Sequence, residues 1–292
     1  MNDMNANDRW AAGRKHALTT IATLVIVGLL AAMASSQMGA RSQSSQTGVG
    51  NKTEKHGGTP AEELPEAEFH MARMMYRTFG GGGSRGYSQP WWAIDYPMAE
   101  EHFFPALRRL TNLNVAEDSR HLPLSDDRLF DYPFLFLQQP GQGNWQPTPQ
   151  EAERLREYFL RGGFMLVDDF HGEYEWSVFE SVIQRVLPGK PIVEIPEDDP
   201  LMHVFYDLGD RLQIPGRRHV GMTRGGQTVV RMEGEPHWRG IYDDHGRLMV
   251  AMNFNIDMGD AWEHADDPYY PAPMTGQAYR LGVNYVIYAM TH

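Results

Sequence analysis

Hydrophobic and polar positions between about residues 69 and 292 follow two alternating periods, which predict alternating strands and helices. Short apolar runs bounded by turn residues predict strands, and apolar residues at helical spacing predict helices. The expected strands cover 69–76, 113–115, 132–137, 164–167, 192–195 and 246–253. The expected helices cover 98–112, the segment between Thr148 and Gly162, 175–187 and 276–290. This alternation indicates an α/β domain with an open, mostly parallel sheet and helices on both faces.

The clearest unit of the pattern runs from Thr148 to Gly172. Thr148 and Glu151 form a capping box with Pro149 at the first helical position, and Gly162-Gly163 closes the helix. The buried strand 164–167 then leads directly into the polar turn 168–172.

A different pattern precedes residue 68. Residues 1–16 are polar and basic, 17–34 form an uncharged apolar run, and 35–67 are rich in Ser, Gln, Gly, Thr and Glu. The run is long for a signal peptide and close to the length of a spanning helix, so cleavage and membrane anchoring both remain open. Either alternative exports the rest of the chain, which we expect to be periplasmic or anchored in the inner membrane with the C-terminal domain outside the cytoplasm. We expect a flexible linker over 35–67 and one folded domain over 68–292.

Composition narrows the chemistry. The formal net charge of −12 argues against nucleic-acid binding, because phosphate contacts need a basic surface. The sequence has no cysteine, which excludes thiolate metal sites and a cysteine nucleophile.

Several longer motifs resemble a known family. They are the strand 69–76 before a glycine run, Trp92 with Asp95-Tyr96-Pro97, the segment 162–172, the segment 253–263, and the ending 279–285. Together they are similar to the bacterial domain-of-unknown-function family numbered 4159, over essentially the whole folded part.

The resemblance implies a class I glutamine amidotransferase-like fold of the flavodoxin-like type. It also implies export or membrane attachment, the latter through 17–34 if that segment is uncleaved. Some relatives are encoded near MoxR-type ATPases and von Willebrand factor A proteins, which implies an envelope protein partner. The fold places a catalytic cysteine in the turn that corresponds to 168–172, and this chain has none there. Glutaminase chemistry is therefore not expected.

Two acidic clusters are the candidate metal or acid–base groups. Asp168, Asp169 and His171 follow a buried strand, where they could bind a divalent cation or act as acid and base. Strand alternation sends the two aspartates to opposite sides, so one of them could instead cap a helix. The second cluster contains Asp257, Asp260 and Glu263 in an expected long loop over 257–267, which could bind a ligand or stay solvated.

Other residues are candidates for ligand binding, each with a structural alternative. Gly82 and Arg85 could bind an anion or belong to a flexible loop, and His219 and Arg224 could bind a substrate or form ion pairs. Trp92 and Trp262 could stack on a sugar or fill the core. The motifs of the resemblance add Asp95 and Asn255.

Three functional hypotheses follow. We favour an exported, non-catalytic binding or interaction module of amidotransferase-like fold. The alternative is a metal-assisted hydrolase of envelope carbohydrate that uses both acidic clusters, and a third hypothesis is a sugar-binding protein. The hydrolase requires that the two acidic clusters converge on one ion.

Overall fold

The structure is a computed structural model that describes residues 67–78, 89–209, 211–231 and 234–292. The apolar segment 17–34, the residues before it and the expected linker up to residue 66 lie outside the described residues. Gly82 and Arg85 also lie outside them. Among the described residues, no helix combines the length and the apolar character that crossing a membrane requires.

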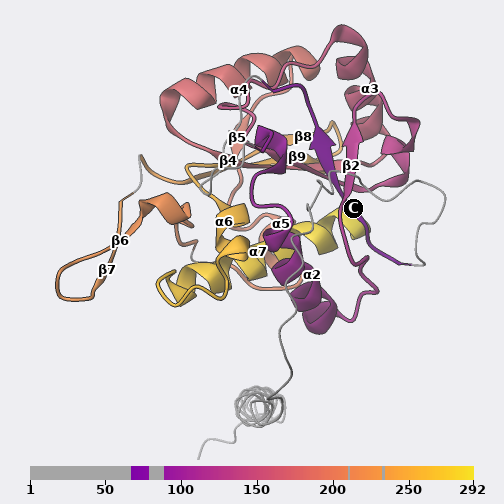
Figure 1. Cartoon of the computed structure of the whole chain (residues 1–292). Coiled ribbons are helices and arrows are strands. Elements are labelled where there is room, and N and C mark those ends of the chain that lie inside the picture. The colour runs from indigo at the N-terminus through magenta and orange to yellow at the C-terminus, as the bar shows by residue number, and fades with distance from the viewer. Residues whose placement is uncertain (1–66, 79–88, 210, 232–233) are drawn as a thin grey trace, which may run out of the picture. The chain divides into compact units, whose positions relative to one another are not determined.

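Seven strands form one mixed sheet. They are β1 (Met71–Met75), β2 (Arg120–Pro123), β3 (Phe134–Gln138), β4 (Phe164–Phe170), β5 (Val193–Glu194), β8 (His237–Tyr242) and β9 (Leu248–Phe254). Hydrogen-bonded neighbours follow the order β2-β1-β3-β4-β9-β8-β5. Figure 1 shows β8 and β9 of this sheet between α4 above and α7 below. The pairs from β2 to β9 are parallel, whereas β9–β8 and β8–β5 are antiparallel. The prediction of a mostly parallel sheet is therefore confirmed.

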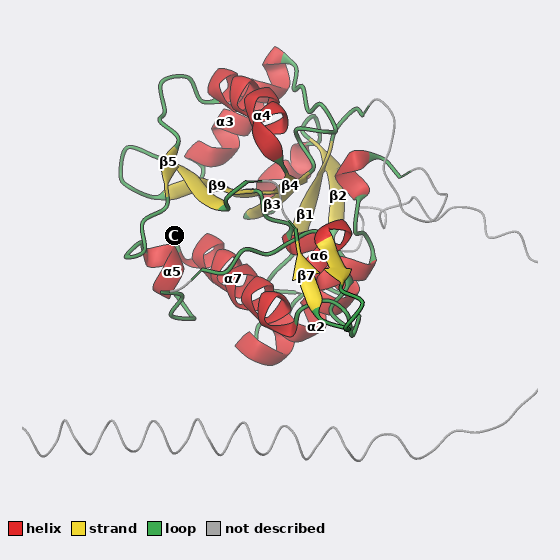
Figure 2. Ribbon diagram, turned by 90° about the vertical axis from the view of Figure 1, so that its left-hand side faces the viewer, coloured by secondary structure: helices red, strands yellow, loops and turns green. Residues whose placement is uncertain are grey.

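Helices cover both faces of this sheet. They are α2 (Met98–Thr111), α3 (Pro149–Leu160), α4 (Gly172–Val186), α5 (Pro200–His203), α6 (Met258–Glu263) and α7 (Ala272–Thr291). Figure 2 shows α3 and α4 on one side, and α2, α5, α6 and α7 on the other. A hydrophobic core lies on each face of the sheet. Alternate residues of β3 pack into one core or the other, because side chains along a strand point to opposite faces. Phe134 and Phe136 pack with the α2–α7 side, and Leu135 and Leu137 pack with the α3–α4 side.

The capping box predicted at the N-terminus of α3 is present. Thr148 Oγ1 accepts a hydrogen bond from the backbone N of Glu151, and Glu151 Oε2 accepts one from the backbone N of Thr148. These two bonds satisfy amide groups that lack partners within the helix. The chain then enters β4, whose seven residues are all buried, as expected for a central parallel strand.

Three expected elements differ from the structure. Residues 113–115, an expected strand, follow the left-handed C-cap residue Asn112 of α2 and make only an isolated bridge between Val115 and Phe69. The second neighbour of β1 is instead β2. The expected strand 192–195 is reduced to the two exposed residues of β5 at the sheet edge. The expected loop 257–267 begins with the helix α6.

Three short 3-10 helices and a small hairpin complete the described elements. They are η1 (Trp91–Ala93), η2 (Asp127–Asp131), η3 (Arg217–His219) and the antiparallel pair β6 (Val220–Met222) and β7 (Thr228–Val230). The strand order reverses at β1, since β2 lies on one side of it and β3 on the other. In open α/β sheets, ligands bind beyond the carboxyl ends of the strands near such a reversal.

Candidate functional site

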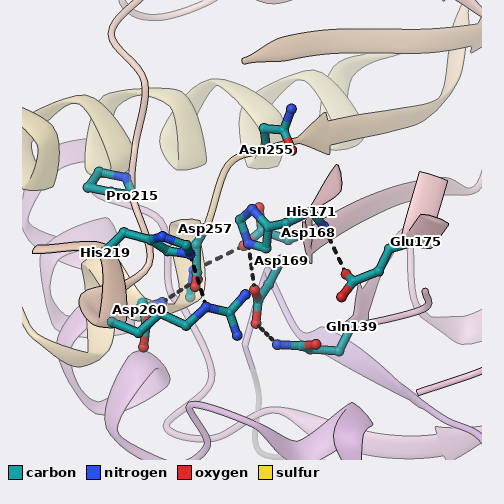
Figure 3. A network of polar contacts seen from close by, with 12 residues as sticks. Gln139, Asp168, Asp169, His171, Glu175, Pro215, His219, Asn255, Asp257 and Asp260 are labelled. Atoms are coloured by element: carbon teal, nitrogen blue, oxygen red, sulfur yellow. Dashed lines mark hydrogen bonds and ion pairs between the residues drawn. The ribbon is translucent and has the colours of Figure 1, made fainter. Parts of the chain in front are cut away.

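Polar side chains gather where β3, β4 and β9 end. Parallel pairing places Gln138 of β3 opposite Asp168 of β4, and Phe170 of β4 opposite Phe254 of β9. The residues that follow these strands therefore meet at one edge of the sheet. Figure 3 shows Asp168, Asp169 and His171 at this edge, with Asp257 and Asp260 on one side of them and Gln139 and Glu175 on the other. We call this set of side chains the acidic centre.

Asp168 anchors α6 to the sheet. Its Oδ2 accepts hydrogen bonds from the backbone N of Met258 at 2.8 Å and of Gly259 at 3.0 Å, and its Oδ1 accepts one from Asn253 Nδ2 at 3.0 Å. Burial raises the pKa of Asp168 to about 7, although these hydrogen bonds act in the opposite direction. The sequence left open whether one aspartate caps the helix that directly follows it, which is α4. Asp168 instead accepts hydrogen bonds at the start of α6.

Asp169 is buried and hydrogen-bonded on both oxygens. Its Oδ1 accepts from His171 Nε2 at 3.0 Å, and its Oδ2 accepts from Gln139 Nε2 and from Gln138 Nε2. Burial alone would raise the pKa of Asp169, but the hydrogen bond and charge of His171, together with the charge of Arg218, hold it below its usual value. The pKa values of the adjacent Asp168 and Asp169 are therefore shifted in opposite directions.

His171 has one ring nitrogen without a partner. Because a carboxylate oxygen can only accept, His171 Nε2 carries the hydrogen of the bond to Asp169. The ring is 6% exposed, and its Nδ1 is buried with no hydrogen-bond partner among the described residues. The backbone N of His171 donates to Glu175 Oε2 at 2.8 Å, which fixes the start of α4. In the neutral ring, Nδ1 offers a buried lone pair.

Asp257 brings the second acidic cluster to the first. It caps α6 by accepting a hydrogen bond from the backbone N of Asp260 at 2.8 Å, and it is 2% exposed. Burial, and then the charges of Asp169 and Asp260, raise the pKa of Asp257 well above its usual value. Gly216 lies so close that an added Cβ would be 2.8 Å from Asp257 Oδ2.

Asp95 enters the acidic centre from the segment before α2. Its Oδ2 accepts a hydrogen bond from Gln138 Nε2 at 2.6 Å. Burial, and then the charge of Asp260, raise the pKa of Asp95 well above its usual value. A Cβ on Gly259 would overlap Asp95 Oδ2, so the glycine makes room for this carboxylate in the first turn of α6.

These side chains form three groups whose geometry suits a metal ion. The groups are Asp169–His171–Asp257, Asp95–Asp257–Asp260 and Asp260–Glu263–His264, and within each the ligand atoms lie within 4.8 Å of one another. Opposite ligands of one ion are about 4.2 Å apart, since each lies about 2.1 Å from it. The first two groups share Asp257, so the turn 168–172 and the segment 257–263 converge, as the hydrolase hypothesis requires.

Backbone conformation sets the acidic centre apart as well. Six described residues other than glycine have positive φ, and four of them lie at this edge: Asp95, Gln139, Asp169 and Asn255, with φ of 68°, 50°, 55° and 57°. Such conformations are uncommon outside glycine and tend to cluster at functional sites. They turn the chain sharply at the ends of β3, β4 and β9.

The remaining candidates take different places. His219 lies beside the acidic centre, with its ring centroid 5.7 Å from that of His171, whereas Arg224 is exposed in the β6–β7 turn. Asn255 is structural, because its Oδ1 accepts from the backbone N of Gly172 and its Nδ2 donates to the carbonyl of Glu235.

The two tryptophan candidates pack inside the domain. Trp262 is 2% exposed and stacks on Phe103 at 4.2 Å between ring centroids, so it fills the core and offers no face to a sugar. Trp92 is half-buried against His121, at 5.1 Å between centroids. Trp262 therefore cannot stack on a sugar as the sugar-binding hypothesis requires.

Gln138, Gln139 and Arg218 belong to the acidic centre but were not among the candidates. The two glutamines directly follow a buried strand, as Asp168 and Asp169 do, so the same rule applied to 132–137 would have found them. No pattern in the sequence points to Arg218, because η3 reaches the centre only through the tertiary fold. Its charge lowers the pKa of Asp169.

Comparison with known proteins adds a family. No curated protein matches the chain. The model of the domain of unknown function DUF4159 matches residues 73–290, which is well over half of the 292 residues and includes every residue of the acidic centre. The chain therefore belongs to the DUF4159 family.

Proposed function

We propose that this chain is an exported binding domain of class I glutamine amidotransferase-like fold whose acidic centre holds a divalent cation. The mostly parallel sheet with helices on both faces supports that fold. The centre lies at the turn after β4, where the fold would carry a catalytic cysteine, and the chain has none. A binding role, rather than glutaminase activity, follows for this site.

The observation that carries the proposal is His171 Nδ1. A nitrogen lone pair buried without a hydrogen-bond partner is costly, and this one lies in a ring whose other nitrogen donates to Asp169. Metal-binding histidines characteristically donate their second N–H to a carboxylate in this way, so for a cation on Nδ1 Asp169 is the carboxylate that orients the ring and not a ligand. Gln138 Oε1 and Gln139 Oε1 are also buried and have no partner among the described residues. A cation would satisfy such acceptors.

Charge supports the same conclusion. Asp95, Asp169 and Asp257 are each at least nine-tenths buried, and burial, followed by the charges of neighbouring carboxylates, raises the pKa of Asp95 and of Asp257. Buried carboxylates of like charge need protons or a cation to be stable. Imidazole nitrogen combined with carboxylate and amide oxygens suits Mn²⁺ or Zn²⁺ better than Ca²⁺.

The first experiment measures the metal directly. The purified chain, treated with chelator and then loaded with Mn²⁺ or Zn²⁺, is expected to retain about one ion by elemental analysis. His171→Ala is expected to reduce the affinity by at least about 10-fold, on the scale of changes near metal ligands. His245→Ala is the control, because His245 is exposed in the β8–β9 turn. Equal metal content in wild type and His171→Ala would sink the proposal, as would no bound metal in either.

A metal-assisted hydrolase is the second candidate. It is favoured by one observation, the half-buried group Asp260–Glu263–His264, which shares Asp260 with the buried groups. A carboxylate beside a bound cation can accept a proton from a metal-bound water. The test is turnover of chromogenic phosphate, ester and glycoside substrates by the Mn²⁺-loaded protein and by Glu263→Gln. Turnover that falls at least about 100-fold in the variant, the size of a general-base contribution, would replace the binding role with catalysis. No turnover would exclude the hydrolase.

The proposed location is outside the cytoplasm, with an envelope protein as partner. The basic residues before the apolar run 17–34 support it, together with the family resemblance. Fractionation of cells that express the chain with and without residues 1–34 tests the location. Recovery of the full chain in the cytoplasm would contradict it.

A further inference from the structure

The segment 216–219 lies against the acidic centre. The backbone N of Arg217 donates to Asp260 Oδ2 at 2.6 Å, and Gly216 is in close contact with Asp257. The ring of His219 lies 5.7 Å from that of His171. Figure 3 shows His219 beside Asp257 and Asp260. Arg218, between Arg217 and His219, is thereby held at the same side of the centre.

His219 fixes the orientation of the Arg218 side chain. His219 Nδ1 donates to the carbonyl of Arg231 at 2.8 Å, because a carbonyl oxygen can only accept. His219 Nε2 then accepts a hydrogen bond from Arg218 Nε at 3.0 Å. This bond uses one of the five N–H groups of the guanidinium. The two terminal nitrogens of this exposed side chain keep their N–H groups for other acceptors.

Arg218 is more than a counter-ion for Asp169. Both oxygens of Asp169 already accept hydrogen bonds, from His171 and from the two glutamines. Arg218 forms no ion pair within 4.0 Å with any residue in the described part of the chain, although its charge acts on Asp169 and Glu175. An arginine held at its Nε, whose terminal N–H groups form no hydrogen bond with the described residues, suits a planar or tetrahedral oxyanion, which it can bind with two parallel hydrogen bonds.

We propose that the acidic centre binds a small oxyanion, a carboxylate or phosphate group, between its cation and the guanidinium of Arg218. This inference rests on the proposed cation site. Without the cation, the buried aspartates would repel an anion, so the oxyanion can bind only after the metal. One oxygen of the group would bind the cation, and the terminal nitrogens of Arg218 would donate hydrogen bonds to the remaining oxygen of a carboxylate or the remaining oxygens of a phosphate.

Calorimetric titration of inorganic phosphate and of acetate, with and without saturating Mn²⁺, tests this inference. We expect binding only in the presence of Mn²⁺. Arg218→Gln should weaken it by at least 10-fold while leaving Mn²⁺ affinity within about 3-fold, and Arg218→Lys should recover part of the loss because it keeps the charge but not the planar fork. The control is Arg109→Gln, an exposed arginine of α2. Tighter binding of phosphate than of acetate would identify a phosphate-bearing ligand, and the reverse order a carboxylate.

The outcomes separate the two proposals. Mn²⁺ binding without any anion binding would overturn the oxyanion site and leave the cation site standing. Anion binding that is independent of Mn²⁺, or unchanged in Arg218→Gln, would also overturn it. Absence of Mn²⁺ binding in the wild type would overturn the cation site itself. Because Arg218 is exposed, its variants are expected to fold, and their urea unfolding midpoints confirm that.

Discussion

Asp168 and Asp169 are adjacent in the sequence, yet their surroundings shift the pKa of their carboxyl groups in opposite directions. Burial is the main cause of the raised pKa of Asp168, whose hydrogen-bond donors are all neutral. Asp169 faces the imidazole of His171 and the guanidinium charge of Arg218. The strand alternation predicted that the two side chains would diverge, and they do so in role: one positions α6 and the other orients the ring of His171.

A buried ion pair between Arg73 and Glu100 stabilises the segment that leads to Asp95. The guanidinium of Arg73 on β1 binds Glu100 on α2 through two hydrogen bonds, of 2.5 Å and 3.1 Å, and both side chains are almost fully buried. Arg73 Nη1 also donates to the carbonyls of Trp92 and Ile94. These bonds fix the segment that carries Asp95 into the acidic centre.

Removing one charge of that pair should be strongly destabilising. Glu100→Gln is expected to lower the free energy of unfolding by about 3–5 kcal/mol, because it leaves the guanidinium of Arg73 buried without a counter-charge. Urea unfolding measures the change. The matched control is Glu157→Gln, since Glu157 pairs with Arg161 on the surface, four residues apart on the chain and half exposed. It should change stability by no more than about 0.5 kcal/mol. Equal effects of the two substitutions would contradict the role given to burial.

Among the elements, α6 shows what a local pattern misses. Its N-cap, Asp257, is a favourable capping residue, but Gly259 in the first turn disfavours a helix and indicates a loop. The structure explains the glycine by the nearby Asp95 carboxylate, which comes from a segment more than 150 residues earlier. A helix of six residues is too short to be stable on its own and depends on tertiary contacts, so it cannot be predicted from its own residues.

The helix α7 contains two glycines whose surroundings differ, which gives a matched pair of substitutions. A Cβ on Gly282 would lie 2.7 Å from Trp262 and 2.9 Å from Phe103, whereas a Cβ on Gly276 would meet nothing within 4 Å. Gly276→Ala should stabilise the protein by up to about 1 kcal/mol through helix propensity. Gly282→Ala should destabilise it by about 1–3 kcal/mol through overpacking. The melting temperatures of both variants measure this, and a stabilising Gly282→Ala would refute the tight packing of α7 on α2 and α6.

At the scale of the molecule, the sequence predicted the alternation of strands and helices and the acidic residues at the end of the strand 164–167. Buried runs such as 164–167 carry that information locally, because a strand covered on both faces must be apolar throughout. The sequence did not predict which polar residues meet. Asp95, Gln138 and Arg218 come together only through the strand order and the packing of η3, which depend on contacts across the whole chain.

The proposed cation site would link cation binding to the stability of the whole domain. A ligand that binds only the folded state adds about 2.7 kcal/mol to the free energy of unfolding when its concentration is 100 times its Kd. Thermal unfolding with increasing Mn²⁺ should therefore show a progressive rise in the melting temperature. The rise should be absent in His171→Ala and preserved in His245→Ala. A melting temperature that ignores Mn²⁺ in the wild type would count against the site.

The central position of β9 has a consequence for biosynthesis. β9 lies between β4 and β8 in the sheet but follows both in the chain, so the ribosome releases about 80 residues between β4 and its partner. Until β9 is synthesised, β4 has one unpaired edge that can pair with other nascent chains. The first four residues of β4 are all apolar, which favours such pairing. Holding chaperones are thus expected to bind the nascent chain between β4 and β9, and ribosome profiling of chaperone-bound chains can locate that interval.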